Sequence, residues 1–310
     1  MELGYKVSSS ARRPAWSSGV LLKLILAGSA LAMLLAVQSY DRAPSLQQMP
    51  FAVYAVSYGE SRFPEAYVFY DRSNASLDAT LPFGWLFYAI RDVAGGWTLI
   101  DAGFHDTHLR TTEWALTSYA DPLTLLAVNL GVKADDVHTL IITHHHVDHA
   151  GSMLRFPAAT LVMHSLVAAE LRKPENVQGI TDVHDGAIDE LAAQGRLRTF
   201  ESRWSDPIPL DVDMHHRLRI ESIGGHAPGS CMVWIDHLEH GLERPVALLT
   251  GDEIYLPQNY LTGRPTGTTV DVKRSASAVE EIRRAAAEGT FVFTYHDPDT
   301  VQGLGTRRVL

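Results

Sequence analysis

The sequence predicts an α/β protein built from short strands and helices around a large core. Several apolar, strand-like runs end near an Asp or a His beside a glycine, as at 97–103 and 246–252. Patterns typical of amphipathic helices lie between such runs, as at 277–288. A chain of 310 residues with 46% hydrophobic residues can bury a substantial core, as one large domain or two ordinary ones.

Residues 1–40 differ from the rest of the chain and are predicted to be a signal peptide or a membrane anchor. Lys6, Arg12 and Arg13 precede an apolar stretch at 24–37. A basic segment followed by about fourteen apolar residues is typical of an export signal, because a stable membrane-spanning helix usually needs about twenty. An uncleaved anchor and an ordinary buried helix are the alternatives. We therefore expect an exported (periplasmic or secreted) or membrane-anchored protein, rather than a cytoplasmic one, with a folded domain at 45–310.

The first half of the folded domain combines strand-like and helix-like stretches. Strands are expected near 51–58, 66–70, 85–91, 97–100, 139–143 and 159–163. Helices are expected near 106–119, 122–130, 165–172 and 185–194, and Gly195 is a suitable stop for the last of them.

The second half repeats the pattern. Strands are expected near 197–200, 218–223, 231–235, 246–249 and 291–294. A helix at 277–288 is expected between the last two strands, because Ser277 and Glu280 suit a capping box and Gly289 follows. The stretches 173–185 and 259–269 are expected to be loops near the mouth of a site. Cys231, the only cysteine of the sequence, is expected to be a small buried hydrophobe.

The segment 143–151 is the most informative part of the sequence. It reads Thr-His-His-His-Val-Asp-His-Ala-Gly and contains His144-x-His146-x-Asp148-His149 directly behind an apolar run. Imidazole and carboxylate groups are metal ligands, and four of them so close in sequence can serve two metal ions as readily as one. A chance histidine-rich tract is the alternative, since the chain has 15 histidines.

Further strand-like runs support metal binding, because each ends on another candidate ligand. These candidates, with the run that each follows, are Asp101 (97–100), His226 (218–223), Asp252 (246–249) and His296 (291–293). A rigid sheet presents a site to solvent in this way. His145 alternates away from its neighbours, so it is expected to point to the other side of the loop.

Together these residues resemble the metallo-β-lactamase superfamily. The resemblance extends from about residue 50 to the end of the chain, and it rests on the 144–149 signature with the later ligands in the right order. It implies a four-layer αββα sandwich, with two mixed sheets face to face, helices outside and a dinuclear metal site at one edge of the sheets. The domain at 45–310 is then a catalytic domain, and the chain is expected to be a hydrolase.

The resemblance also implies a role for each candidate ligand at a site for two zinc ions. The first ion takes His144, His146 and His226, the second takes Asp148, His149 and His296, and Asp252 bridges both. A hydroxide between the ions is then the nucleophile. Zinc is preferred because diiron members tend to carry Glu where His146 stands, although other divalent metals suit the same donors. Asp101 is expected to orient a ligand histidine or the signature loop, or to be a simple turn residue.

Tyr255, three residues after Asp252, resembles a tyrosine of the N-acyl-homoserine lactone lactonases. There it contacts the lactone carbonyl and helps to stabilise the oxyanion. True β-lactamases of this fold lack the bridging Asp and many use a Cys, unlike this chain. The resemblance therefore implies that lactone rings are opened, with Tyr255 and Asp148 as catalytic residues and Asp148 as the group that carries a proton to the leaving alkoxide. A packed aromatic after a strand is the alternative for Tyr255.

Charge restricts the expected partners. The whole chain carries −10 and residues 1–40 carry +3, so the remainder carries −13. A body this acidic repels phosphate backbones, which argues against nucleic acid and leaves a small-molecule lactone or ester, with membrane attachment only through the N-terminal segment.

Two other functions stay open. A thioester hydrolase of the glyoxalase II type shares the ligand set, but it needs a basic patch for glutathione carboxylates, and Arg307 with Arg308 is too little to form one. A relic of the fold that binds metal without catalysis is the other alternative. A complete ligand set argues against it.

Overall fold

The computed structural model describes residues 50–310 except 71–77, 106–113, 178–182 and 212. The predicted signal or anchor segment at 1–40 lies outside the described residues. None of the helices in the described part combines the length and the apolar character that a membrane crossing requires.

The first β-sheet comes from the first half of the domain together with the C-terminus. Within the described residues its strands are β1 (Ala52–Pro64), β2 (Thr80–Arg91), β3 (Trp97–Ile100), β4 (Leu116–Tyr119), β5 (Val137–Ile141), β6 (Thr160–His164), β7 (Leu197–Phe200) and β13 (Gly305–Arg308). Their order is β13-β1-β2-β3-β5-β6-β7, and β4 also pairs with β1. The neighbours β1, β2 and β3 are antiparallel, whereas β3, β5, β6 and β7 run parallel.

The second β-sheet comes from the second half. Within the described residues its strands are β8 (Ile208–Pro209), β9 (His216–Ser222), β10 (Cys231–Glu239), β11 (Leu242–Leu249) and β12 (Phe291–Phe293), in the order β12-β11-β10-β9-β8. His240 and Gly241 form the two-residue turn of the β10–β11 hairpin, both with positive φ, which matches the twist of the flanking strands. The short β12 is parallel to β11.

One hydrophobic core lies between the two sheets. In β10, Cys231, Val233 and Ile235 belong to this core, whereas Met232 and Trp234 pack with the helix α10 (Val272–Ala287). The period-two alternation of a strand causes this division, because successive side chains point to opposite faces. Burial of Cys231 confirms the prediction for that residue.

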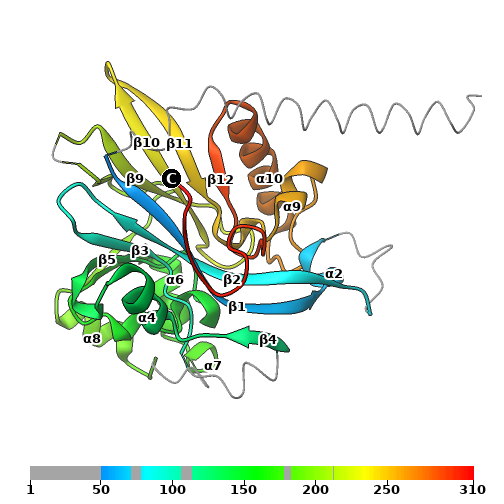
Figure 1. Ribbon diagram of the computed structural model, residues 1–310, viewed down its shortest axis with the longest axis horizontal. Coiled ribbons are helices and arrows are strands. Elements are labelled where there is room, and N and C mark those ends of the chain that lie inside the picture. Colours follow the sequence, from blue (N-terminus) through cyan, green and yellow to red (C-terminus); the bar gives the residue numbers. More distant parts are fainter. Residues whose placement is uncertain (1–49, 71–77, 106–113, 178–182, 212) are drawn as a thin grey trace, which may run out of the picture. The chain divides into compact units, whose positions relative to one another are not determined.

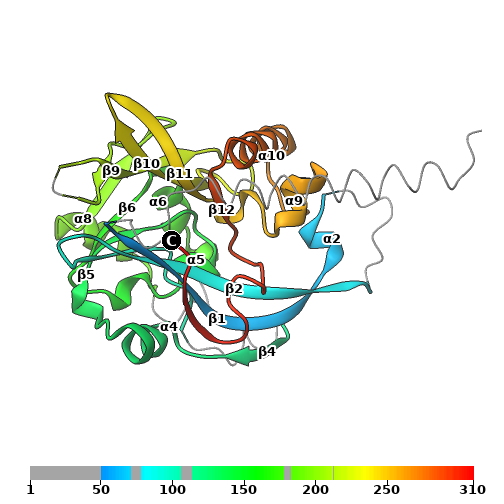
Figure 2. The same ribbon diagram turned by 45° about the horizontal axis from the view of Figure 1, so that its top comes forward.

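Helices cover the outer face of each sheet, as Figures 1 and 2 show. The first sheet packs against α4 (Pro122–Leu125, continued by a π-helical turn at Leu126–Leu130), α6 (Ser165–Leu171) and α8 (Ala187–Ala193), and the second packs against α10. Shorter helical turns in the described part are α2 (Glu65–Val68), Ala134–Asp136, α5 (Val147–Ala150), Met153–Arg155, α7 (Pro174–Val177), Gly251–Glu253 and α9 (Pro257–Thr262). This architecture agrees with the predicted α/β class and with the layers that the resemblance implied.

Two stretches were assigned to the wrong type of element. The stretch 66–70 is not a strand, since Glu65–Val68 forms the helical turn α2, in which Ala66 and Val68 are both buried and so imitate strand alternation. Residues Leu116–Tyr119 are not helical but form β4, which pairs with β1. Of the rest of that predicted helix, 114–115 forms a turn and 106–113 lies outside the described residues.

Other boundaries also differ from the prediction. Helix α10 begins at Val272 rather than at 277, because the carboxylate of Asp271 accepts hydrogen bonds from the backbone N–H groups of Lys273 and Arg274. Ser277 is therefore not a cap, and its hydroxyl donates to the carbonyl of Lys273 inside the helix. The stretches expected to be loops, 173–185 and 259–269, contain α7 and part of α9.

The ends of β3, β5, β9, β11 and β12 meet at one edge of the two sheets. The N–H of Asp101, just after β3, donates to the carbonyl of Ile141 at the end of β5. The N–H of Cys231 donates to the carbonyl of Thr143, which ties the second sheet to the segment after β5. Parallel strands place their carboxyl ends at the same edge, so the candidate ligands that follow these strands are brought together there.

Candidate metal centre

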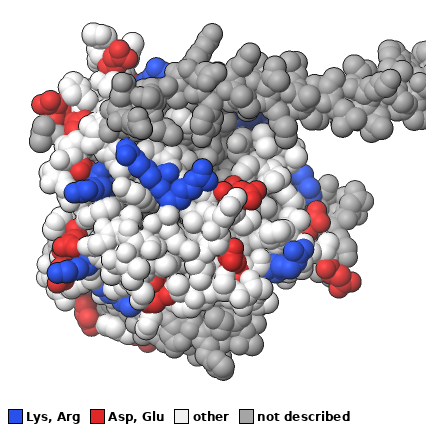
Figure 3. Space-filling view, viewed as in Figure 1, with Lys and Arg blue, Asp and Glu red and all other residues white. Residues whose placement is uncertain are grey.

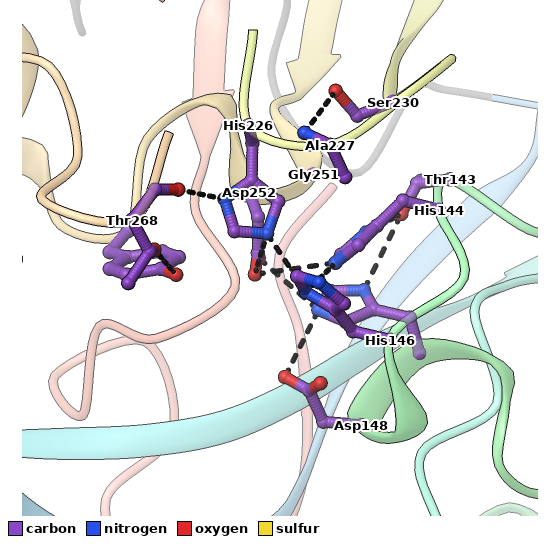
Figure 4. Close-up of polar contacts among 12 residues, drawn as sticks. Thr143, His144, His146, Asp148, His226, Ala227, Ser230, Gly251, Asp252 and Thr268 are labelled. Carbon is purple, nitrogen blue, oxygen red and sulfur yellow. Dashed lines mark hydrogen bonds and ion pairs between the residues drawn. The ribbon is translucent and has the colours of Figure 1, made fainter. Parts of the chain in front are cut away.

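The seven side chains predicted to bind metal lie together at this edge of the sheets. Among the described residues they form two groups, each with ligand atoms within 4.8 Å of one another. One group contains His144, His146, His226 and Asp252, and the other contains Asp148, His149, Asp252 and His296. Figure 4 shows the first of these groups with Asp148 beside it.

In the first group three imidazoles converge on one point. The Nδ1 atom of His146 lies 3.0 Å from Nε2 of His144 and 3.0 Å from Nε2 of His226. The Oδ2 atom of Asp252 completes the group, 3.6 Å from Nε2 of His144 and 3.5 Å from Nε2 of His226.

The second group uses the other carboxylate oxygen of the same aspartate. Oδ1 of Asp252 lies 3.2 Å from Nε2 of His149 and 3.2 Å from Nε2 of His296. Oδ2 of Asp148 lies 3.2 Å from Nε2 of His149 and 3.8 Å from Nε2 of His296. Asp252 therefore offers one oxygen to each group, as a bridging ligand does.

In three of the histidines, a hydrogen-bond acceptor holds the outer ring nitrogen, the one that faces away from the other ligands. Nδ1 of His226 donates to the backbone carbonyl of Thr268 at 2.6 Å, and Nδ1 of His296 donates to that of Gly84 at 2.9 Å. Nδ1 of His149 lies 2.8 Å from Oδ2 of Asp101. A histidine that donates through Nδ1 presents the lone pair of Nε2 to the centre, which is the tautomer that binds a metal.

The donor set fits a pair of divalent cations. Nε2 of His149 is buried and makes no well-aligned hydrogen bond within the described residues, although it lies 3.2 Å from carboxylate oxygens of Asp148 and Asp252. A buried polar atom without a partner is costly, and a cation between these donors would satisfy it. Imidazole nitrogen and carboxylate oxygen are ligands that zinc accepts. The two groups therefore indicate a dinuclear metal site.

Burial and charge prepare the ligands for metal. Burial lowers the pKa of His144, of His146 (to about 3) and of His226, so these imidazoles are neutral at pH 7. Burial raises the pKa of Asp252, but the nearby His149 and His296 outweigh it and hold that pKa well below its usual value. These four ligands are thus already in the protonation states that metal binding requires.

His149 behaves differently when no metal is bound. Burial lowers its pKa, but the carboxylates of Asp252, Asp148 and Asp101 outweigh this and raise the pKa well above the usual value. Without a cation, His149 therefore takes up a proton and partly offsets the buried negative charge. A metal ion at this position replaces that proton.

Asp101 organises the loop that carries the signature. Its Oδ1 accepts from the N–H of Thr143 at 2.8 Å, and its Oδ2 accepts from the hydroxyl of Thr143 at 2.7 Å and faces His149. Asp101 also has a positive φ of 65°, a backbone conformation in which Asp is one of the less unfavourable residues. These contacts agree with the orienting role expected for Asp101.

A pocket of about 320 Å³ opens onto both groups of ligands. Its walls include aromatic rings at Phe63, Phe83, Trp85, Trp114 and Tyr255. The rings of Trp85 and Trp114 stack with centroids 4.4 Å apart, and the ring of Phe83 stacks on His296 at 4.1 Å. No Lys or Arg is among the described residues that line this pocket. The pocket therefore suits a neutral molecule with an apolar part.

Tyr255 lies in this pocket beside ligands of both groups. Its ring centroid is 4.9 Å from that of His296 and 5.7 Å from that of His226, and the side chain is 5% exposed. Burial, followed by the negative charge of Asp252, raises the pKa of the Tyr255 hydroxyl well above 10. The phenol is thus neutral and can donate a hydrogen bond.

Several residues that support the site were not found from the sequence. Glu253 is buried, and its Oε1 accepts from the N–H of Gly225 and the hydroxyl of Ser230, which fixes the turn that carries His226. Its position next to Asp252 was a signal, but an acidic residue after a strand has many ordinary explanations. His145 belongs to neither group of ligand atoms, consistent with the expectation that it is not a ligand.

Comparison with known proteins identifies the family. The family model of the metallo-beta-lactamase superfamily matches residues 86–291, and the chain belongs to this superfamily. Its fold is thus that of a group of metal-dependent hydrolases. A comparison with curated protein sequences gives no match.

Solved structures with the same fold include several hydrolases. A quorum-quenching N-acyl homoserine lactone lactonase is 17% identical with a TM-score of 0.60, covering 81% of this chain and 94% of that one. A probable metal-dependent hydrolase from Staphylococcus aureus is 17% identical with a TM-score of 0.62, covering 84% and 98%. An N-acyl homoserine lactone hydrolase with N-hexanoyl-L-homoserine at its catalytic metal center is 16% identical with a TM-score of 0.59, covering 80% and 94%. At these identities the likeness concerns the fold alone.

Proposed function

We propose that this protein is a zinc-dependent lactonase that opens the ring of N-acyl-homoserine lactones or related lactones. The observation that carries the proposal is the position of the Tyr255 phenol, neutral and nearly buried, in a pocket shared with both groups of metal ligands. A donor in that position can stabilise the negative charge that develops on a carbonyl oxygen.

The pocket favours a lactone over a glutathione thioester. Its aromatic walls suit an acyl chain, and none of its described lining residues is a cation that could pair with glutathione carboxylates. The face of the molecule in Figure 3 carries acidic and basic side chains interspersed, with one short row of basic groups. The lactonases among the similar structures give a further, weaker reason, since they share the fold.

The chain's own residues would act on the ring as follows. Two metal ions, when bound, would supply an activated water and polarise the carbonyl group. Tyr255 would donate a hydrogen bond to the carbonyl oxygen as negative charge grows there. Asp148, which lines the same pocket, would accept a proton from the water. It would pass that proton to the ring oxygen when the C–O bond breaks, and the product is an N-acyl-homoserine.

The full-length chain, loaded with zinc, tests this proposal in a hydrolysis panel of homoserine lactones, simple esters and a glutathione thioester. We expect the lactones to be the fastest substrates and a chelator to abolish their turnover. The Tyr255→Phe variant should keep two metals per chain and lose about 10- to 100-fold in kcat, less than the loss of a sole oxyanion donor because the metal shares this task.

Each alternative has its own outcome in the panel. Faster turnover of the thioester would favour a hydrolase of the glyoxalase II type. Tight zinc binding without turnover of any substrate would favour a metal-binding relic of the fold. An unchanged rate in Tyr255→Phe would remove the reason for choosing a lactone.

We also propose that residues 1–40 direct export or anchor the protein to a membrane. The basic residues before the apolar stretch 24–37 support this proposal. Fractionation of cells that express the full-length chain, with N-terminal sequencing of the product, tests it. Recovery of the intact chain in the cytoplasm would contradict it.

A further inference from the structure

The segment 266–270, between α9 and α10, is packed tightly beside the metal centre. The N–H of Gly267 donates to the carbonyl of Tyr67 at 2.9 Å, and a Cβ added at Gly267 would lie 2.3 Å from the carbonyl oxygen of Ala66. On the other side, the N–H of Val270 donates to the carbonyl of Gly225 at 2.9 Å. The segment is thus held between α2 and the turn that carries His226.

Thr268, in the middle of this segment, makes two contacts with the site. Its backbone carbonyl accepts from Nδ1 of His226 at 2.6 Å, and its side-chain hydroxyl is hydrogen-bonded to the hydroxyl of Tyr255. Figure 4 shows the contact between Thr268 and His226. One residue therefore touches a metal ligand through its backbone and the proposed oxyanion donor through its side chain.

These two contacts do different things. The carbonyl fixes the tautomer of His226, and it remains when the side chain is replaced. The hydroxyl acts on Tyr255, because a Thr268 hydroxyl that donates to the phenol oxygen leaves the phenol proton free to point at a substrate in the pocket that both residues line. Without that donor, the phenol loses a partner that fixes its direction.

We propose that Thr268 is a positioning residue that aims the hydroxyl of Tyr255, while its carbonyl separately orients His226. This inference rests on the proposed lactonase function for its kinetic test. The hydrogen bond itself exists whether or not a lactone is the substrate, so it can be measured independently.

The test compares Thr268→Val, which keeps the shape and the carbonyl but removes the hydroxyl, with Thr268→Ser, which keeps the hydroxyl. We expect Thr268→Val to lose about five- to tenfold in kcat, the effect of one neutral hydrogen bond, with little change in KM. Thr268→Ser should restore most of the rate. Zinc content and zinc affinity should be unchanged in both variants, because the carbonyl still holds His226.

Thr266→Val is a matched control in the same segment. Thr266 is buried, and its hydroxyl has no hydrogen-bond partner among the described residues, so its removal should not change kcat. In a Tyr255→Phe background, Thr268→Val should cause no further loss, because its effect passes through the phenol.

A spectroscopic measurement separates this inference from the proposed function. The NMR resonance of the Tyr255 Cζ carbon, assigned through its loss in Tyr255→Phe, should shift in Thr268→Val and stay near its wild-type position in Thr268→Ser. A shift without lactone turnover would overturn the lactonase proposal alone. An unchanged resonance, an additive loss in the double variant, or zinc loss that parallels the loss of rate would overturn the role of Thr268.

Discussion

Replacing Asp101 with Asn tests whether metal binding by the second group of ligands depends on the hydrogen bond that Asp101 makes to His149. With its oxygen kept toward the N–H of Thr143, an asparagine places its NH₂ group where Oδ2 now accepts from the hydroxyl of Thr143 and faces His149. Two donors would then oppose each other. His149 would have to accept at Nδ1 and carry its proton on Nε2, the atom that points to the metal ligands.

The magnitude follows from the contact that is lost. One hydrogen bond to a charged group contributes about 1.5–3 kcal/mol, which corresponds to roughly 10- to 100-fold in metal affinity. We therefore expect Asp101→Asn to weaken binding at the group of Asp148, His149 and His296 by this factor. The group of His144, His146 and His226 should change much less.

Zinc titration against a competing chelator, which resolves the two binding steps, measures this effect. Asp236→Asn is the control: Asp236 is also a buried carboxylate, but it pairs with Arg219 in the second sheet, away from the ligands. The control should lower the free energy of unfolding and leave zinc affinity alone. If each binding step had the same zinc affinity in Asp101→Asn as in wild type, that result would refute the reasoning. An equal loss of zinc affinity in Asp236→Asn would also refute it.

Three further predictions concern metal content, pH and the boundary of α10. Asp252→Ala should lose metal from both groups, because one carboxylate serves both; metal analysis that finds one ion fully retained would contradict the bridging role. Burial raises the pKa of Glu253 from 4.5 to about 7, so between these pH values the folded, metal-free protein binds more protons than the unfolded chain. Its free energy of unfolding therefore falls as pH rises through this interval, by about 3 kcal/mol in all. Glu253→Gln cannot titrate and should gain stability over wild type across the same interval in urea unfolding; a difference that does not vary with pH would contradict this. Asp271→Ala should lower the free energy of unfolding by about 1 kcal/mol through the lost helix cap, whereas Ser277→Ala should have a smaller effect in the same assay.

The strands around the centre were predicted well, because their signals are local. The run 97–100 matches β3, and the strands that carry ligands were found within a few residues of their ends. The run 197–200 matches β7 at the edge of the first sheet. The errors at 66–70 and 116–119 have a common cause. Apolar patterns of only four or five residues fit both periods, and only pairing with β1 or packing around α2 decides between them.

The cluster of candidate metal ligands was also predictable, since its chemistry is carried by side chains that the sequence spells out. All seven lie in the two groups of ligand atoms. The acceptors that hold the outer histidine nitrogens were not predictable, because Gly84 and Thr268 act through backbone carbonyls, which every residue has. The aromatic walls of the pocket were hidden for a related reason: a Phe or Trp in a strand is as suitable for a core as for a substrate pocket.

The sequence by itself determined the kinds of ligand, their order after the strands and therefore the superfamily, since these depend on side-chain chemistry and short-range pattern. Only the tertiary structure decided which oxygen of Asp252 faces which histidines, and which carbonyl fixes each imidazole. It also decided that Thr268 touches both His226 and Tyr255. These relations join residues that are separated in the sequence, by as much as the distance from Gly84 to His296, and such separations leave no local pattern to read.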